Sequence, residues 1–108
     1  MKILIDGKRI INEKGFHREF KEKMGFPDYY GENMDAWIDC MSYIDDKSAC
    51  MSTIVINKGE NLIIEVENSE YLKQNNEEIY NELVECTAIV NTRFGNIKSD
   101  TKVELFLK

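Results

Sequence analysis

The chain has 108 residues, of which 43% are hydrophobic, and its formal net charge at pH 7 is −6. This length has room for one core, so we expect a single domain over residues 1–108, and the apolar share argues against disorder. A negative surface repels phosphates, which excludes direct nucleic-acid binding as an expected function.

The first half of the chain predicts one strand and two helices. Residues 2–6 are a short apolar run closed by an Asp-Gly turn signal, which indicates a buried strand. Residues 13–24 place apolar side chains every four residues, which predicts an amphipathic helix ended by the glycine and proline that follow. Residues 25–33 are expected to form a loop. Asn33 is a good N-cap for a second helix over residues 34–44.

The second half predicts strands around a long helix. Residues 52–56 and 61–67 are both extended and β-branched, and the second is the stronger strand. Asn68-Ser69 can cap a short turn of helix. Residues 76–92 then predict a long helix and residues 102–107 the last strand. The core candidates of the long helix are Ile79, Leu83, Val84 and Val90.

The order of these elements is strand, helix, helix, strand, helix, strand. Strands separated by helical crossovers indicate a mainly parallel sheet. We therefore expect a small three-layer α/β fold, in which a mainly parallel three-stranded sheet is packed with helices.

The net charge of the chain is confined to one segment. Residues 24–46 hold six acidic residues and no Lys, Arg or His, whereas the rest of the chain has 14 acidic and 14 basic residues. The six are Asp28, Glu32, Asp35, Asp39, Asp45 and Asp46. Such a local excess of charge predicts an acidic surface that binds a basic protein.

The helix expected over residues 34–44 has an apolar side and an acidic side. At 100° per residue, Asp35, Asp39 and Tyr43 lie together opposite the apolar stripe. Two carboxylates at this spacing repel each other by about 0.2–0.5 kcal/mol, and no neighbouring Lys or Arg relieves them. A solvated acidic face is the alternative interpretation, but the missing cation favours a binding function.

Tyr29 and Tyr30 precede this helix in a glycine-bounded loop. Aromatic side chains supply contact area at a low entropic cost and are frequent at binding hot spots. The alternative is that these rings pack into the core. We expect a split, with one ring facing inward and the other outward.

The remaining reactive residue types predict no catalytic or metal site. Cys40, Cys50 and Cys86 are an odd number of cysteines without a CxxC pair, which argues against a disulfide framework. Cys40 and Cys86 are expected to be packed thiols. His17 is the only histidine and is expected to be exposed, so neither zinc nor any other cofactor is expected.

The sequence also predicts where the protein resides. No apolar run is long enough to cross a bilayer, and the N-terminus lacks the apolar stretch and cleavage site of a secretory signal. Unpaired cysteines fit a reducing compartment. We therefore expect a cytoplasmic protein without membrane contact.

The segment over residues 25–41 resembles the signature of the barstar family, whose members inhibit barnase-type ribonucleases. The segment reads GFPDYYGENMDAWIDCM. The family's order of aliphatic residue and tryptophan is reversed here at Trp37-Ile38, although both side chains still face the apolar side. The resemblance implies a three-stranded parallel sheet packed with helices.

The resemblance also implies how the protein acts. In the family, the acidic loop and helix, here residues 26–46, plug the basic active site of a ribonuclease. Asp39 matches the carboxylate that takes the place of the RNA phosphate. Together with the aromatic residues argued above, the expected partner-binding residues are Tyr29, Tyr30, Asn33, Asp35, Ala36, Asp39 and Tyr43. Glu82 and Glu85 of the long helix stay unassigned.

Two other functions compete with ribonuclease inhibition. An enzyme would need carboxylates in unequal environments, usually in a pocket, and a solvent-facing stripe does not provide one. A binding module for a basic protein that is not a ribonuclease would use the same acidic face. The sequence favours an inhibitor that serves as an immunity protein against a secreted nuclease toxin.

Overall fold

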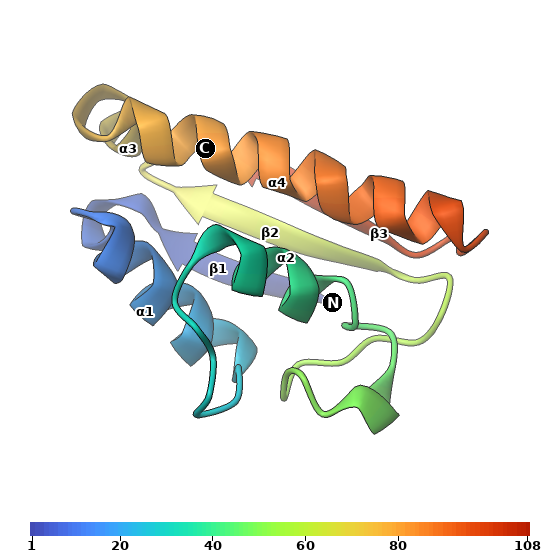
Figure 1. Cartoon of the computed structure of the whole chain (residues 1–108). Helices are drawn as coiled ribbons and strands as arrows, with labels where there is room; N and C mark the ends of the chain where they lie inside the picture. Colours follow the sequence, from blue (N-terminus) through green and yellow to red (C-terminus); the bar gives the residue numbers. More distant parts are fainter.

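Three parallel strands form the sheet of the protein, which a computed structural model describes over residues 1–108 (Figure 1). β1 (Lys2–Asp6) pairs with β2 (Asn61–Glu67), and β2 pairs with β3 (Lys102–Leu107), so the strand order is β1-β2-β3. The α/β class, the parallel sheet and all three of these strands confirm the expectations from the sequence.

Four α-helices and two short 3-10 helices connect the strands. In chain order they are η1 (Gly7–Arg9), α1 (Glu13–Met24), α2 (Met34–Met41), η2 (Lys47–Ala49), α3 (Ser69–Asn75) and α4 (Glu77–Asn96). α1 has the bounds expected from its apolar spacing. Gly25 ends it in the left-handed conformation, with φ of 69°, where the absence of a Cβ avoids strain.

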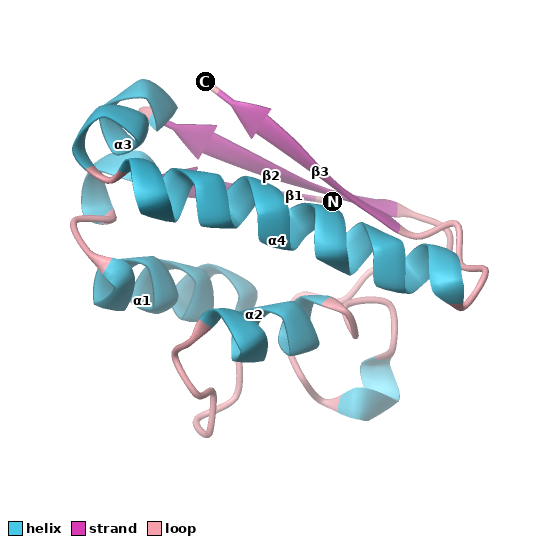
Figure 2. Cartoon of the chain, turned by 45° about the horizontal axis from the view of Figure 1, so that its top comes forward, coloured by secondary structure: helices cyan, strands magenta, loops and turns pink.

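The three longest helices cover only one face of the sheet, so the fold has two layers and the expected third layer is absent (Figures 1 and 2). On the open face, Leu4 is 45% exposed and Phe106 is 49% exposed. The strand order explains this arrangement. Both crossovers move in the same direction across the sheet, so crossovers of the same hand place their helices on the same face.

Residues 52–56 do not form a strand, contrary to the expectation from their β-branched side chains. The Thr53 N–H donates to the Met24 carbonyl at 3.0 Å, and the Ile56 N–H donates to the Ile44 carbonyl at 2.9 Å. These bonds tie the segment to the end of α1 and to the turn after α2 rather than to a sheet edge. A local β propensity is therefore overridden by tertiary contacts.

The expected ends of two helices are also corrected. α2 stops at Met41, where the Ser42 hydroxyl donates to the Ile38 carbonyl at 2.6 Å and a turn follows. α4 continues to Asn96, because no proline interrupts its last turns. Val84 of α4 is 40% exposed and does not belong to the core, whereas Leu83 and Val90 are fully buried.

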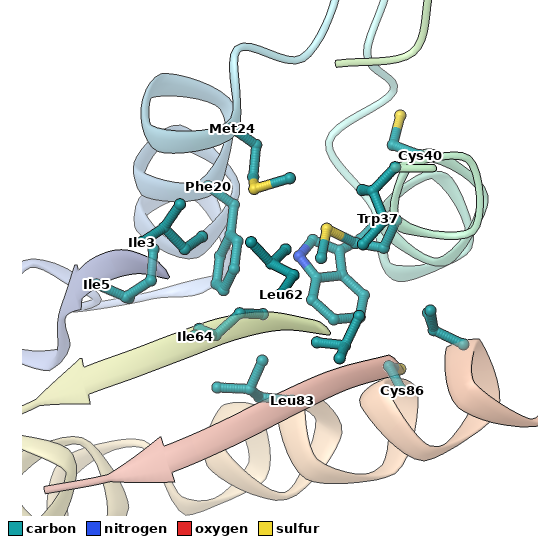
Figure 3. Packing of buried hydrophobic residues seen from close by; sticks show 14 of the residues in the cluster. Ile3, Ile5, Phe20, Met24, Trp37, Cys40, Leu62, Ile64, Leu83 and Cys86 are labelled. Atoms are coloured by element: carbon teal, nitrogen blue, oxygen red, sulfur yellow. The ribbon is translucent and has the colours of Figure 1, made fainter. Parts of the chain in front are cut away.

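The core lies between the sheet and the helices, and Trp37 is the largest side chain that is fully buried in it. Figure 3 shows this indole reaching from α2 toward Leu62 of β2. Its ring centroid lies 5.5 Å from that of Phe20 and 6.1 Å from that of Phe16, both on α1. Trp37 therefore joins α2 to α1 and to the sheet.

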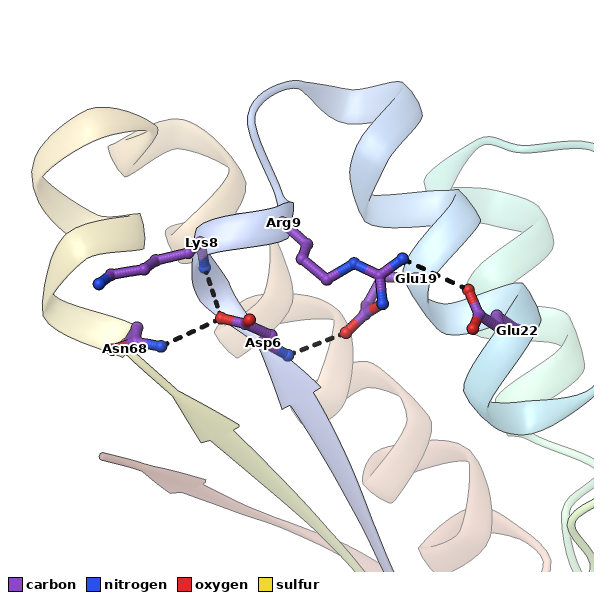
Figure 4. A network of polar contacts seen from close by, with 6 residues as sticks. All are labelled: Asp6, Lys8, Arg9, Glu19, Glu22 and Asn68. Carbon is purple, nitrogen blue, oxygen red and sulfur yellow. Dashed lines mark hydrogen bonds and ion pairs between the residues drawn. The ribbon is translucent and has the colours of Figure 1, made fainter.

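A polar network fixes the connection between β1 and α1 (Figure 4). The Asp6 carboxylate accepts hydrogen bonds from the Lys8 N–H and the Asn68 amide, and these bonds lower the pKa of Asp6. The Asp6 N–H donates to buried Glu19 at 2.9 Å, and Arg9 lies 3.4 Å from the same carboxylate. The middle of α1 is thereby held against the end of β1.

Candidate functional site

The N-terminus of α2 is built by Asn33. Its side-chain oxygen accepts a hydrogen bond from the Ala36 N–H at 2.8 Å, so the expected N-cap is confirmed. Its amide donates to the Gly31 carbonyl at 3.4 Å. Glu32, just before it, has a φ of 52°, a left-handed conformation that non-glycine residues rarely adopt. The loop thus turns sharply into the helix and leaves Glu32 exposed.

The two faces of α2 differ as expected from the sequence. Asp35 and Asp39 are exposed, while Trp37 and Met41 on the opposite side are fully buried and Ala36 is half-buried. The helix has only eight residues and would not be stable alone. The buried side chains therefore hold the two carboxylates on a fixed support.

The tyrosines of the loop divide as expected. Tyr29 is 72% exposed, and its hydroxyl lies 3.6 Å from the Met51 sulfur. Tyr30 is 6% exposed, and its hydroxyl hydrogen-bonds Nδ1 of His17 at 2.5 Å. Tyr30 was also expected among the partner-binding residues. This assignment is corrected, because the ring is buried against α1 and holds the loop on that helix.

His17 is fully buried, so its expected exposure is wrong. The loop after α1 folds back over the side of the helix that carries His17, and a helical wheel of α1 alone does not contain that contact. Burial lowers the pKa of His17, while the nearby carboxylates of Glu13 and Glu32 oppose the shift. The folded protein therefore favours a neutral imidazole beneath the loop.

The buried imidazole makes stability depend on pH. Below about pH 6.5 the unfolded chain binds a proton at His17 that the folded chain does not bind. The stabilisation is complete above that value and is lost as the pH falls toward the lowered pKa of the folded state. We expect the free energy of unfolding of the wild type to fall more than that of His17→Gln between about pH 7.5 and about pH 5.5.

Urea unfolding at several pH values in this window measures the effect. Carboxylates with lowered pKa values, such as Asp6, lose their contribution only near pH 4 or below, so they do not interfere. Parallel pH profiles of the wild type and His17→Gln would contradict the assignment of the effect to His17.

The six acidic residues of the segment 24–46 have two different roles. Asp45 is buried and accepts a hydrogen bond from the Thr101 hydroxyl at 2.7 Å, and Asp46 caps η2. These two carboxylates stabilise the fold, so we no longer assign them to the expected binding surface. The four that remain exposed are Asp28, Glu32, Asp35 and Asp39.

One of these carboxylates has a cationic neighbour that the sequence did not reveal. Asp39 Oδ1 lies 2.7 Å from Arg93 Nη1. Arg93 belongs to α4, which lies beside α2 (Figure 2). The inference that Asp39 lacks a compensating cation was drawn from neighbours along the chain and is wrong. A partner 54 residues away has no local signal in the sequence.

Acidic side chains of α4 lie near the same surface. Burial and the neighbouring Glu13, Glu78 and Glu85 raise the pKa of Glu82. Burial, Glu82, Glu85 and then Asp35 raise the pKa of the Cys86 thiol. The negative field at the start of α2 thus comes from α1 and α4 as well as from the segment 24–46.

Two of the three thiols are packed, as expected. Cys40 and Cys86 are buried and Cys50 is exposed. Burial and the adjacent Asp39 raise the pKa of Cys40 to about 11, so its thiol is protonated at neutral pH.

No group of three or more His, Cys, Asp or Glu side chains is arranged to hold a metal ion. None of the helices has the length and apolar character required to span a membrane.

Comparison with known proteins identifies the family. Residues 1–106 match the family described as Barstar (barnase inhibitor). The chain belongs to the Barstar family. The match extends from β1 into β3, well beyond the signature at residues 25–41 from which the resemblance was inferred.

One relative is the protein named putative ribonuclease inhibitor YrdF, from Bacillus subtilis (strain 168). The two sequences are 49% identical over 41 residues. This region covers 38% of the present chain and 45% of the length of YrdF. Membership of the Barstar family and this relative support ribonuclease inhibition at the level of the family.

Proposed function

We propose that this protein inhibits a ribonuclease by inserting loop 26–33 and α2 into the basic active site of that enzyme. Asp39 takes the place of the RNA phosphate, and Tyr29, Asn33, Asp35, Ala36 and Tyr43 are the other residues that contact the enzyme. The observation that carries the proposal is the exposure of Asp35 and Asp39 on a short helix whose other face is anchored by fully buried Trp37.

The chemistry of a ribonuclease supports this arrangement. An active site that holds RNA must be basic, because it binds phosphates. A carboxylate can pair with those cations through two oxygens, as a phosphate does. A support that is already ordered lowers the entropic cost of binding. The exposed carboxylates of Asp35 and Asp39 meet these requirements. They can do so without taking part in catalysis, so we propose an inhibitor rather than an enzyme.

We further propose that the protein acts in the cytoplasm as an immunity protein against a secreted nuclease toxin. A nuclease that attacks the RNA of its own producer must be neutralised before it is exported. The negative field of the surface speeds encounter with a basic nuclease. A basic protein without nuclease activity is the second candidate, since exposed carboxylates on α2 would also suit it.

An inhibition assay tests the proposal. The protein is titrated into purified secreted bacterial ribonucleases, with barnase included, and RNA cleavage is followed. Stoichiometric inhibition of one nuclease is expected, and the protein alone should not cleave RNA or model esters. Binding of a basic protein without any loss of nuclease activity would favour the second candidate, and turnover by the protein alone would contradict the assignment as a non-enzyme.

Salt should slow association with the inhibited nuclease. The Debye length shrinks from about 30 Å at 0.01 M to about 3 Å at 1 M ionic strength, which screens the acidic surface. We expect the association rate constant to fall by roughly tenfold or more over this range, with a smaller change in the dissociation rate constant. Stopped-flow mixing measures both. An association rate that does not depend on salt would contradict electrostatic steering.

A further inference from the structure

Arg93 places a positive charge at the centre of the proposed acidic surface. Its Nη1 atom lies 2.7 Å from Asp39 Oδ1 and 3.5 Å from the Ser42 hydroxyl oxygen. Among the exposed carboxylates of the segment 24–46, Asp39 alone forms an ion pair within the chain; Asp28, Glu32 and Asp35 form none. The carboxylate with the central role in the proposed function is therefore already paired in the free protein.

This ion pair can open at little cost, because both groups face water. The side chains of Arg93 and Asp39 are 47% and 56% exposed. Exposed pairs of this kind contribute little to stability and are screened by salt. While the pair is closed, however, the guanidinium occupies one carboxylate oxygen and repels any cation that approaches Asp39. An incoming cation must therefore compete with Arg93.

The surroundings give Arg93 a place to move when it is displaced. Its side chain lines a surface hollow of about 320 Å³ between the end of α2 and the last turns of α4. The other lining residues are Ser42, Tyr43, Phe94, Asn96 and Ile97. Tyr43 is 47% exposed there, and a guanidinium stacks favourably on an aromatic face. The pair can thus open without disturbing the core.

We propose that Arg93 is a specificity-determining residue of the acidic surface. It is an internal counter-ion of Asp39 that a partner must displace. A site with several cations converging on Asp39, such as the phosphate-binding site of a nuclease, displaces it, whereas a basic protein with scattered cations binds weakly. This inference rests on the proposed role of Asp39 as the contact carboxylate.

A hexa-arginine peptide serves as a simple cationic probe. Its binding to the wild type, Arg93→Gln, Arg93→Lys and Lys102→Gln is measured from the shifts of the Asp35 and Asp39 amide signals by NMR. Lys102 is exposed on β3 and forms no ion pair. Lys102→Gln therefore removes one positive charge, as Arg93→Gln does, without breaking an ion pair. We expect Arg93→Gln to bind about two- to fivefold more tightly than Lys102→Gln, because the competitor of the probe is gone. Arg93→Lys should stay close to the wild type.

The Asp39→Asn background shows whether the effect passes through Asp39. There, Arg93→Gln and Lys102→Gln should bind the peptide equally well. Equal affinities in the wild-type background would mean that only the net charge counts, and a gain that persists with Asp39→Asn would mean that Arg93 acts elsewhere; either result overturns the inference. The peptide assay involves no nuclease, so its outcome is separate from that of the inhibition assay.

Discussion

Asp39→Ala should weaken binding of the inhibited ribonuclease by about 2–5 kcal/mol, which is roughly 30- to 5,000-fold in Kd. The replacement leaves the cations of the nuclease buried at the interface without their counter-charge, and that loss raises the dissociation rate most. The magnitude is typical of desolvated interface charge pairs, a class to which the barnase–barstar pairs themselves belong. Titration of RNA cleavage and surface-based kinetics measure it.

A matched control separates this effect from a loss of net charge. Glu67→Ala also removes one exposed carboxylate, but at the end of β2. It should change Kd by about threefold or less, through the long-range field alone. Asp39→Ala should change the free energy of unfolding by at most about 1 kcal/mol, since its only ion pair is exposed. Equal binding by Asp39→Ala and the wild type would remove Asp39 from the proposed site.

Trp37→Ala should lower the free energy of unfolding by about 3–5 kcal/mol, a large part of the stability of a domain of this size. The side chain is fully buried and fills the space between α2, α1 and β2, so its removal leaves a cavity. Urea unfolding followed by circular dichroism measures the change, because the variant lacks the only tryptophan of the chain.

Trp37→Phe is the control for packing. The indole N–H is buried without a hydrogen-bond partner, so phenylalanine gives up volume but also removes an unsatisfied donor. Its cost should stay well below that of alanine. If the folded fraction of Trp37→Phe inhibits the nuclease as well as the wild type does, Trp37 supports α2 without touching the partner. A strong loss of inhibition at unchanged stability would instead indicate a direct contact.

The sequence predicted most elements of the fold because their patterns are local. The apolar runs at residues 2–6 and 61–67 and the four-residue spacing in α1 depend on neighbours along the chain. The prediction of a strand over residues 52–56 was wrong, because the backbone of this segment bonds to Met24 and Ile44. No local pattern in the sequence encodes such distant partners. The layer count was wrong for a similar reason, since it depends on the order in which the strands pair.

The sequence predicted the charge of the candidate site better than it predicted the contacts that hold the site in place. The acidic stripe of α2 followed from spacing, and the split of Tyr29 and Tyr30 agreed with the burial that the structure shows. His17 and Arg93 were missed, because the first is covered by a loop and the second approaches from a helix late in the chain. Both errors concern contacts between segments that a helical wheel treats separately.

The three thiols differ in burial, and this difference offers a way to follow the binding of a partner to the acidic surface. Cys50 is exposed, whereas Cys40 and Cys86 are buried thiols with raised pKa values. A maleimide fluorophore would therefore label Cys50 selectively under native conditions. Cys50 borders the same surface hollow as Pro27 and Asp28, at the edge of the acidic loop. A dye at this position would report the arrival of a nuclease through its emission, while α2 keeps every one of its own side chains.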